Sequence, residues 1–198
     1  MAEQEMLLDS ATIKAAVAGE KWATEKVIEH YTPMIDELAV DEDMKQHLIL
    51  KLLEELREAG FNRISFGLQD CEDEMLRLLG RGHTAAEGEA AVAMAKAAGF
   101  QNISADFMLA TPGQTPEKAA RLAEYGLSLG VPHLSSYLLK IEPGTAFDRM
   151  GMAQRCPDED TAAECYLAYY KVLEQAGLRH YETVSYTHLR AHETRHDL

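Results

Sequence analysis

The chain has 198 residues, of which 46% are hydrophobic and 26% are charged, so its composition is that of a globular protein. Its formal net charge of -14 at pH 7 argues against nucleic acid or an anionic membrane as a general partner. No apolar run approaches the ~20 residues of a membrane span, and the acidic start lacks the pattern of a secretory signal. The three widely spaced cysteines favour reduced thiols over a disulfide framework. We therefore expect a cytoplasmic protein.

Residues 1–53 show a helical pattern. Asp9 and Ser10 can cap a first helix, which ends at Gly19. A second helix follows and contains Pro33, where a kink or a break is expected. Asp41 opens a third helix whose leucines share one stripe: Leu48, Leu52, Leu53 and Leu56. The sequence predicts a small all-α segment here.

Residues 54–182 alternate between strand and helix patterns. In the first strand, at 62–69, the apolar residues Ile64, Phe66 and Leu68 share one face, and Gln69 shares the other with small or polar residues. Further strands are expected at 102–109, 133–140 and 178–182, and helices at 72–79, 84–98, 115–130 and 158–176. Helices of this length between strands predict βαβ units and a parallel sheet. The pattern alone fits both a closed barrel and an open doubly wound sheet.

Short motifs follow one another through this α/β region. They are GFNRISFGLQD at 60–70, LLGRGHT at 78–84, NISAD at 102–106, TPGQT at 111–115, HLSSY at 133–137, IEPGT at 141–145, PDED at 157–160 and HYE at 180–182. In this order and spacing they resemble the radical SAM barrel proteins of the heme chaperone HemW and oxygen-independent coproporphyrinogen III oxidase-like family. The resemblance implies a partial parallel (β/α) barrel that binds S-adenosylmethionine at its open end.

The resemblance also implies three cofactor-binding residues. They are Gln69 at the end of the first strand, Arg81 after the short helix, and Asp106 on the next strand. An arginine suits the carboxylate of S-adenosylmethionine, whereas an amide or a carboxylate suits its ribose hydroxyls and its ammonium. Two alternatives stay open: Asp106 pairs only with Arg81, or Gln69 only terminates its strand. Cys71 is interpreted as a packing residue.

The cysteines do not form the cluster motif of this family. That motif, Cys-x-x-x-Cys-x-x-Cys, holds a [4Fe–4S] cluster that reduces the sulfonium, but Cys71, Cys156 and Cys165 lie far apart. We therefore expect an internal fragment with no catalytic residue, no metal site and weak independent folding. We also expect an affinity for S-adenosylmethionine too weak to measure and no radical chemistry. The parent protein implied by the resemblance is oxidoreductase-like or a heme chaperone, and its ligand is heme or a porphyrin precursor; the residues leave both activities open.

The two ends of the chain carry other resemblances. Residues 6–53 resemble a helix-turn-helix domain of conjugative transposons, on TIKAAVAG at 12–19, HY at 30–31 and VDEDM at 40–44. A regulatory, DNA-binding protein is therefore an alternative, although acidic residues outnumber basic ones up to Arg57 and a DNA reader usually has a basic face.

The tail at residues 183–198 lacks apolar periodicity, and residues 183–194 resemble a translated sequencing adapter. His188, His192 and His196 have the spacing of a zinc-binding helix face, but we favour the adapter interpretation. We expect an unstructured tail. An assembly chimera without a native function is the third hypothesis.

Overall fold

The computed structural model describes residues 42–182 and 185–187, together with residues 11, 12, 15, 26 and 30. The chain divides into two compact units, Met1–Asn62 with Met94–Phe100 and Arg63–Ala93 with Gln101–Leu198. The two helices expected before residue 41 lie almost entirely outside the described residues, and so do the three histidines of the tail.

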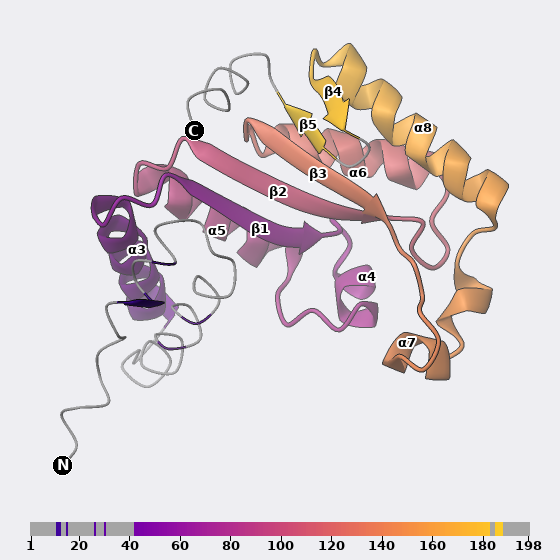
Figure 1. The fold of residues 1–198 in the computed structure, drawn as a ribbon, viewed down its shortest axis with the longest axis horizontal. Helices are drawn as coiled ribbons and strands as arrows, with labels where there is room; N and C mark the ends of the chain where they lie inside the picture. Colours follow the sequence, from indigo (N-terminus) through magenta and orange to yellow (C-terminus); the bar gives the residue numbers. More distant parts are fainter. Residues whose placement is uncertain are drawn as a thin grey trace. The chain divides into compact units, whose positions relative to one another are not determined.

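Helix α3 is the main described element of the first unit and covers Glu42–Glu58 (Figure 1). It is the helix that the leucine stripe predicted, and Leu53 on that stripe is buried. Near its C-terminal end, Nε of Arg57 donates a hydrogen bond to the carbonyl oxygen of Gly99 at 3.4 Å. A cation in the last turn of a helix interacts favourably with the helix dipole.

A five-stranded sheet forms the centre of the second unit, in the order β1-β2-β3-β5-β4 (Figure 1). The strands are β1 (Arg63–Gln69), β2 (Asn102–Leu109), β3 (His133–Leu138), β4 (Arg179–Glu182) and β5 (Ser185–Thr187). The first three strands are parallel, and β5 runs antiparallel to both β3 and β4. The α/β fold with a parallel sheet is therefore confirmed.

The helices that connect the strands begin where the sequence placed them. They are α4 (Asp73–Leu78), α5 (Ala85–Ala97), α6 (Pro116–Ser128) and α8 (Glu159–Gln175). Thr115 caps α6 and Asp158 caps α8, because each side-chain oxygen accepts a hydrogen bond from a backbone N–H of the first turn. Two short elements between β3 and α8 were not predicted, namely α7 (Ala146–Arg149) and a 3-10 helix at Met152–Arg155.

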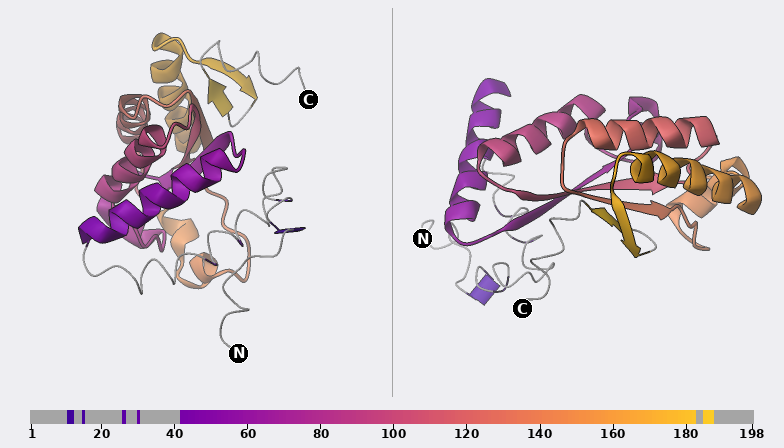
Figure 2. Two further views of the ribbon diagram at one scale, coloured as in Figure 1. Left: turned by 90° about the vertical axis from the view of Figure 1, so that its left-hand side faces the viewer. Right: turned by 90° about the horizontal axis from the view of Figure 1, so that it is seen from above.

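One face of the sheet, here called the apolar face, packs against α6. Its buried residues on β2 and β3 include Ile103, Ala105, Phe107, Leu109 and Leu134. The rings of Phe107 and Tyr125 meet edge to face with their centroids 6.0 Å apart. A Cβ at Gly126 would lie 3.0 Å from Cε2 of Phe107, so this glycine lets α6 approach the sheet. Figure 2 shows α6 beside α8, with which it packs.

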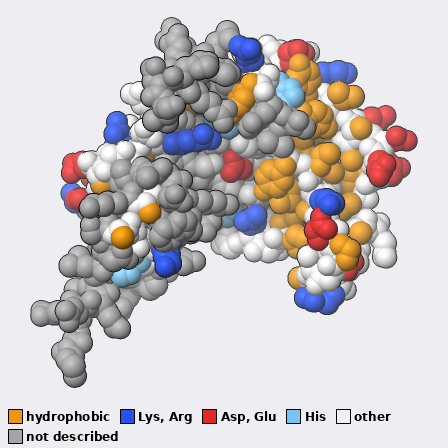
Figure 3. Space-filling view, in the orientation of Figure 1, with side chains coloured by type: hydrophobic (Ala, Val, Ile, Leu, Met, Phe, Trp, Pro, Cys, Tyr) orange, Lys and Arg blue, Asp and Glu red, His pale blue; other side chains and the backbone are white. Residues whose placement is uncertain are grey.

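The opposite face, here called the polar face, carries small and polar side chains. Strand register places Ser65 beside Ser104, Ser104 beside His133, and Asp106 beside Ser135. The polar face consists of Ser65, Gly67, Gln69, Ser104, Asp106, His133, Ser135 and Tyr137. Figure 3 shows the molecule from this side, with hydrophobic side chains gathered near the C-terminal end of β3.

Strand β5 lies in the tail for which no secondary structure was expected. Ser185–Thr187 pairs with His133–Ser135 of β3 and with β4, which differs from the expectation for these three residues. The physical reason is that the edge of β3 offers unpaired backbone groups, and tyrosine and threonine favour extended backbone. The rest of the tail lies outside the described residues.

Candidate functional site

Gln69 ends β1 with its side chain fixed on the polar face. Its backbone φ is 68°, in the left-handed region that costs energy for a residue other than glycine. The side chain is buried, and its Oε1 accepts a hydrogen bond from the hydroxyl of Tyr137 at 2.6 Å. A Cβ at Gly67 would lie only 2.7 Å from Nε2 of Gln69. The amide is therefore held at its oxygen by a tyrosine and accommodated at its nitrogen by a glycine.

Asp106 lies on β2, where two serine hydroxyls hold its carboxylate. Oγ of Ser65 on β1 donates to Oδ2 at 2.9 Å, and Oγ of Ser104 donates to Oδ1 at 3.2 Å. Oγ of Ser104 also lies 2.7 Å from Nδ1 of His133, whose Nε2 lies 2.6 Å from the hydroxyl of Tyr181. The carboxylate is half-buried, so one side remains open to a ligand.

Arg81 lies apart from these two residues in the loop between α4 and α5. Its backbone N–H donates to the carbonyl of Leu76, and its side chain is exposed. Within residues 42–182 and 185–187, no ion pair joins Arg81 to Asp106. The structure therefore brings Gln69 and Asp106 to one face of adjacent strands, does not place Arg81 in contact with them, and does not show the ion pair considered as an alternative for Asp106.

Several residues that support this site carried no functional prediction. The alternating pattern placed Ser65 and Ser104 on the polar face but gave them no partners. His133, Tyr137 and Tyr181 belong to motifs that were recognised only for their resemblance. Their one sequence signal is that His133 and Tyr137 are four residues apart on one strand, which places both on the same face.

An apolar cluster borders the Gln69 end of the polar face. Met75, Leu79 and Met108 form its buried part, and Tyr137 and Phe147 pack against it. Tyr137 belongs both to this cluster and to the hydrogen bond with Gln69, so an apolar surface lies directly beside a polar contact.

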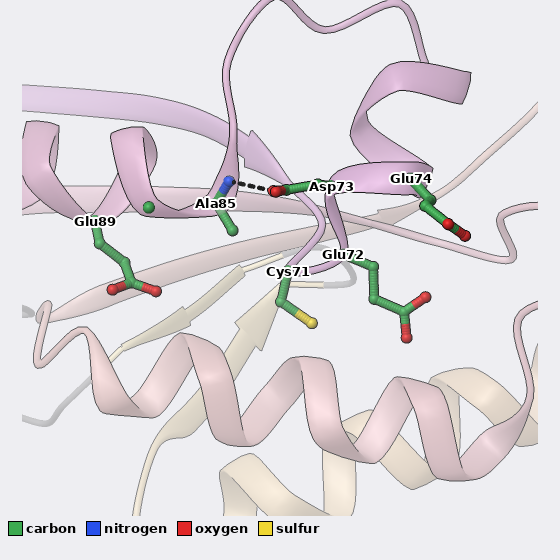
Figure 4. A pocket seen from close by; sticks show the side chains of 7 residues that line it. Cys71, Glu72, Asp73, Glu74, Ala85 and Glu89 are labelled. Atoms are coloured by element: carbon green, nitrogen blue, oxygen red, sulfur yellow. Dashed lines mark hydrogen bonds between the residues drawn. The ribbon is translucent and has the colours of Figure 1, made fainter.

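A separate, open depression of about 530 Å³ lies beyond the end of β1. It is lined by Cys71, Glu72, Asp73, Glu74, Ala85, Ala86 and Glu89 (Figure 4). Oδ1 of Asp73 accepts a hydrogen bond from the backbone N–H of Ala85 at 2.9 Å, which fixes the start of α5. Burial raises the pKa of the Cys71 thiol to about 11, and Asp70 and Glu72 add to the shift. None of the residues predicted to bind a cofactor lines this depression.

The described residues do not fit an iron–sulfur cluster. No group of three His, Cys, Asp or Glu side chains within the described part of the chain can hold a metal ion. Burial raises the pKa of the Cys156 and Cys165 thiols as well. The spacing of the three cysteines along the chain differs from that of a cluster motif. The polar face, in contrast, presents an amide at Gln69 and a carboxylate at Asp106, which together offer hydrogen-bond donors and acceptors. Among the helices that the structure describes, none is long and apolar enough to cross a membrane.

Comparison with known proteins agrees with this fold. The profile of the radical SAM superfamily matches residues 8–143. The heme chaperone HemW of Bacillus subtilis is 34% identical over 166 residues, which cover 83% of this chain and 43% of that protein. HemW of Haemophilus influenzae is 38% identical over 128 residues, which cover 65% of this chain and 33% of that protein. The solved coproporphyrinogen III oxidase (HemN) of Escherichia coli, a radical SAM enzyme, matches with a TM-score of 0.64 and 25% identity over 70% of this chain and 32% of that one.

The chain belongs to the radical SAM superfamily, in its HemW and coproporphyrinogen III oxidase-like group. The family recognised from the motifs is therefore confirmed, and S-adenosylmethionine and a [4Fe–4S] cluster are the cofactors of that family. The chain spans less than half the length of the relatives described here. The superfamily match begins within the N-terminal segment, at residue 8. The helix-turn-helix and adapter resemblances stay predictions.

Proposed function

We propose that this chain supplies the strand-end surface that binds S-adenosylmethionine in a radical SAM protein of heme metabolism. One observation carries the proposal: adjacent parallel strands present the Gln69 amide and the Asp106 carboxylate on the same face, each held by hydroxyl groups. Barrel proteins place ligand-binding groups at the C-terminal ends of their strands, where a rigid sheet fixes them. An apolar cluster beside Gln69 offers a surface for an aromatic ring.

The chemistry of each side chain assigns it a part of the cofactor. Because the Tyr137 hydroxyl occupies Oε1 of Gln69, Nε2 is the group that donates to a ribose hydroxyl or a carboxylate. The open side of Asp106 accepts from an ammonium or a ribose hydroxyl. Arg81 is the remaining candidate for the cofactor carboxylate, since its exposed guanidinium forms no ion pair among the described residues.

We also propose that the 198-residue chain performs no radical chemistry by itself. Reductive cleavage of the sulfonium needs an electron from a [4Fe–4S] cluster, and the spacing of Cys71, Cys156 and Cys165 does not provide its ligands. After anaerobic reconstitution with iron, sulfide and dithionite, mass spectrometry should detect no 5′-deoxyadenosine. Its formation above a protein-free control would refute this part of the proposal.

The relatives support heme metabolism as the wider role. Those described here are named heme chaperone or coproporphyrinogen III oxidase, so heme or a porphyrin precursor is the proposed ligand of the whole protein. The described residues support both activities equally, because Gln69 and Asp106 would serve the shared cofactor.

The cofactor contacts can be tested in the full chain by NMR, which detects binding too weak for calorimetry. S-adenosylmethionine should shift the side-chain resonances of Gln69 and Asp106, and Asp106→Asn should remove the response. Glu89→Gln in the acidic depression is the control and should keep it. Shifts confined to the depression, or none at either residue, would contradict the proposal.

A further inference from the structure

A chain of hydrogen bonds crosses the polar face from β4 to Asp106. It runs from the Tyr181 hydroxyl to His133, from His133 to Ser104, and from Ser104 to the carboxylate, over distances of 2.6, 2.7 and 3.2 Å. Ser104 is completely buried, and His133 is 7% exposed. The rings of His133 and Tyr181 are also in contact, with their centroids 5.9 Å apart. Tyr181 lies 48 residues after His133, so this series of hydrogen bonds connects β4 to Asp106 on β2.

For a neutral His133, the direction of each bond follows from the direction of the Ser104 bond. Oγ of Ser104 donates its single hydroxyl proton to Oδ1 of Asp106. Ser104 must then accept from His133, which requires a proton on Nδ1. A neutral imidazole with its proton on Nδ1 has a lone pair on Nε2, and the Tyr181 hydroxyl donates to it. All three donors therefore point toward Asp106, the arrangement in which successive hydrogen bonds strengthen one another.

We infer that His133 is a positioning residue that holds Asp106 in place through Ser104, with Tyr181 selecting the Nδ1–H tautomer. The inference rests on the proposed function in one respect only, namely that Asp106 contacts S-adenosylmethionine. Ser65 holds the second carboxylate oxygen from the other side. The hydrogen bond from His133 orients the Ser104 hydroxyl, and this hydroxyl holds Oδ1 of Asp106. The exposed side of the carboxylate then stays available to a ligand.

Asparagine and leucine at position 133 separate positioning from packing. The side-chain nitrogen of asparagine occupies nearly the place of Nδ1 and keeps a donor for Ser104, whereas leucine keeps bulk without a donor. In the full chain labelled with ¹⁵N-histidine and ¹³C-aspartate, NMR should show the Nδ1–H tautomer of His133. His133→Leu should shift the Asp106 carboxylate resonance, and His133→Asn should leave it close to wild type. His180→Asn is the matched control, because His180 contacts Tyr166 on the helix α8 side of β4.

The outcomes are decisive even where a variant folds poorly. An Nε2–H tautomer in the wild-type chain would overturn the inference, and so would an unshifted Asp106 resonance in folded His133→Leu. If that variant does not fold, Ser104→Ala and Tyr181→Phe take its place: the first should shift the Asp106 resonance, and the second should mix the His133 tautomers. Unchanged spectra in both Ser104→Ala and Tyr181→Phe would refute the proposed series of hydrogen bonds.

Addition of S-adenosylmethionine distinguishes this inference from the proposed function. If the cofactor leaves the Asp106 resonance of the wild-type chain unmoved while the tautomer and the variants behave as described, the proposed function fails and the positioning role stands. If the cofactor shifts Asp106 equally in wild type and in His133→Leu, the proposed function stands and the positioning role fails. The proposed function and the positioning role both hold if S-adenosylmethionine shifts the Asp106 resonance in wild type and His133→Asn but not in His133→Leu.

Discussion

The two faces of the parallel strands are built by different forces. On the apolar face, buried residues such as Phe107 and Leu134 pack against α6 mainly through van der Waals contacts. On the polar face, Asp106 is held by a hydroxyl group from the neighbouring strand β1, and Gln69 by a hydroxyl group from β3, two strands away. Burial of apolar surface tolerates small errors of position, whereas a hydrogen bond requires defined distance and direction. The apolar face therefore supplies most of the stability, and the polar face supplies the geometry of the site.

Two leucines on one strand test the apolar face most strongly. Leu134 and Leu138 share the same face of β3, but Leu134 is 1% exposed and Leu138 is 47% exposed. Leu134→Ala should destabilise the second unit by about 2–5 kcal/mol, because it removes buried methyl groups and leaves a cavity. Leu138→Ala should cost less than about 1 kcal/mol. Urea unfolding followed by circular dichroism measures both, and equal losses would contradict the packing of α6 on this face.

Cys71, just beyond the end of β1, should give the next largest effect. Burial, together with the carboxylates of Asp70 and Glu72, raises its pKa from 9.0 to about 11. At pH 8 the thiolate fraction, and with it the alkylation rate, should be roughly 100-fold below that of an unperturbed thiol. Because the folded pKa exceeds the unfolded one, the stabilisation linked to this thiol is present below pH 9 and is lost as the pH rises through about 11.

Mass spectrometry after iodoacetamide treatment at pH 8 measures this reactivity. Cys156 is the internal comparison, because the nearby Arg155 opposes the effect of burial on its pKa. In urea all three cysteines should react at similar rates. Rapid alkylation of Cys71 in the folded chain would contradict this prediction, because it would show that burial and the nearby carboxylates do not keep the thiol protonated.

A third test concerns the loop after β2. Ala110 has a φ of 56°, and its buried backbone N–H donates to Oε1 of Gln114 at 2.7 Å. Gln114→Leu keeps the volume but leaves that N–H without its acceptor, which should cost about 1–3 kcal/mol. Gln114→Glu keeps an acceptor and should recover most of the loss. Gln175→Leu, at an exposed position of α8, should change the stability by less than about 0.5 kcal/mol. Equal unfolding midpoints for Gln114→Leu and Gln175→Leu would show that the hydrogen bond from Ala110 to Gln114 does not stabilise the loop.

The sequence predicted the strands and the connecting helices because period-two alternation and capping residues such as Thr115 are local signals. It also placed Gln69 and Asp106 on the same face. It could not predict that Tyr137 holds Gln69 or that His133 reaches Asp106, because these contacts depend on strand register, and the Tyr137–Gln69 pair spans 68 residues. Strand β5 was missed partly for the same reason: β4 directly precedes it, but its other partner, β3, is remote in sequence.

The smallest expected effect is the most informative about the polar face. Tyr137→Phe removes only the hydroxyl that donates to Oε1 of Gln69, and the ring stays in the apolar cluster with Met108. The loss of stability should be about 1 kcal/mol, the usual value of one hydrogen bond. The larger consequence is orientational, since the Gln69 amide becomes free to rotate and Nε2 no longer has a fixed direction. The side-chain NH₂ resonances of Gln69 should broaden or collapse toward those of a solvent-exposed glutamine, and Tyr170→Phe, which removes an exposed hydroxyl on α8, should leave them unchanged. Sharp, unshifted Gln69 resonances in Tyr137→Phe would mean that the left-handed backbone and the space at Gly67 orient the amide without the tyrosine.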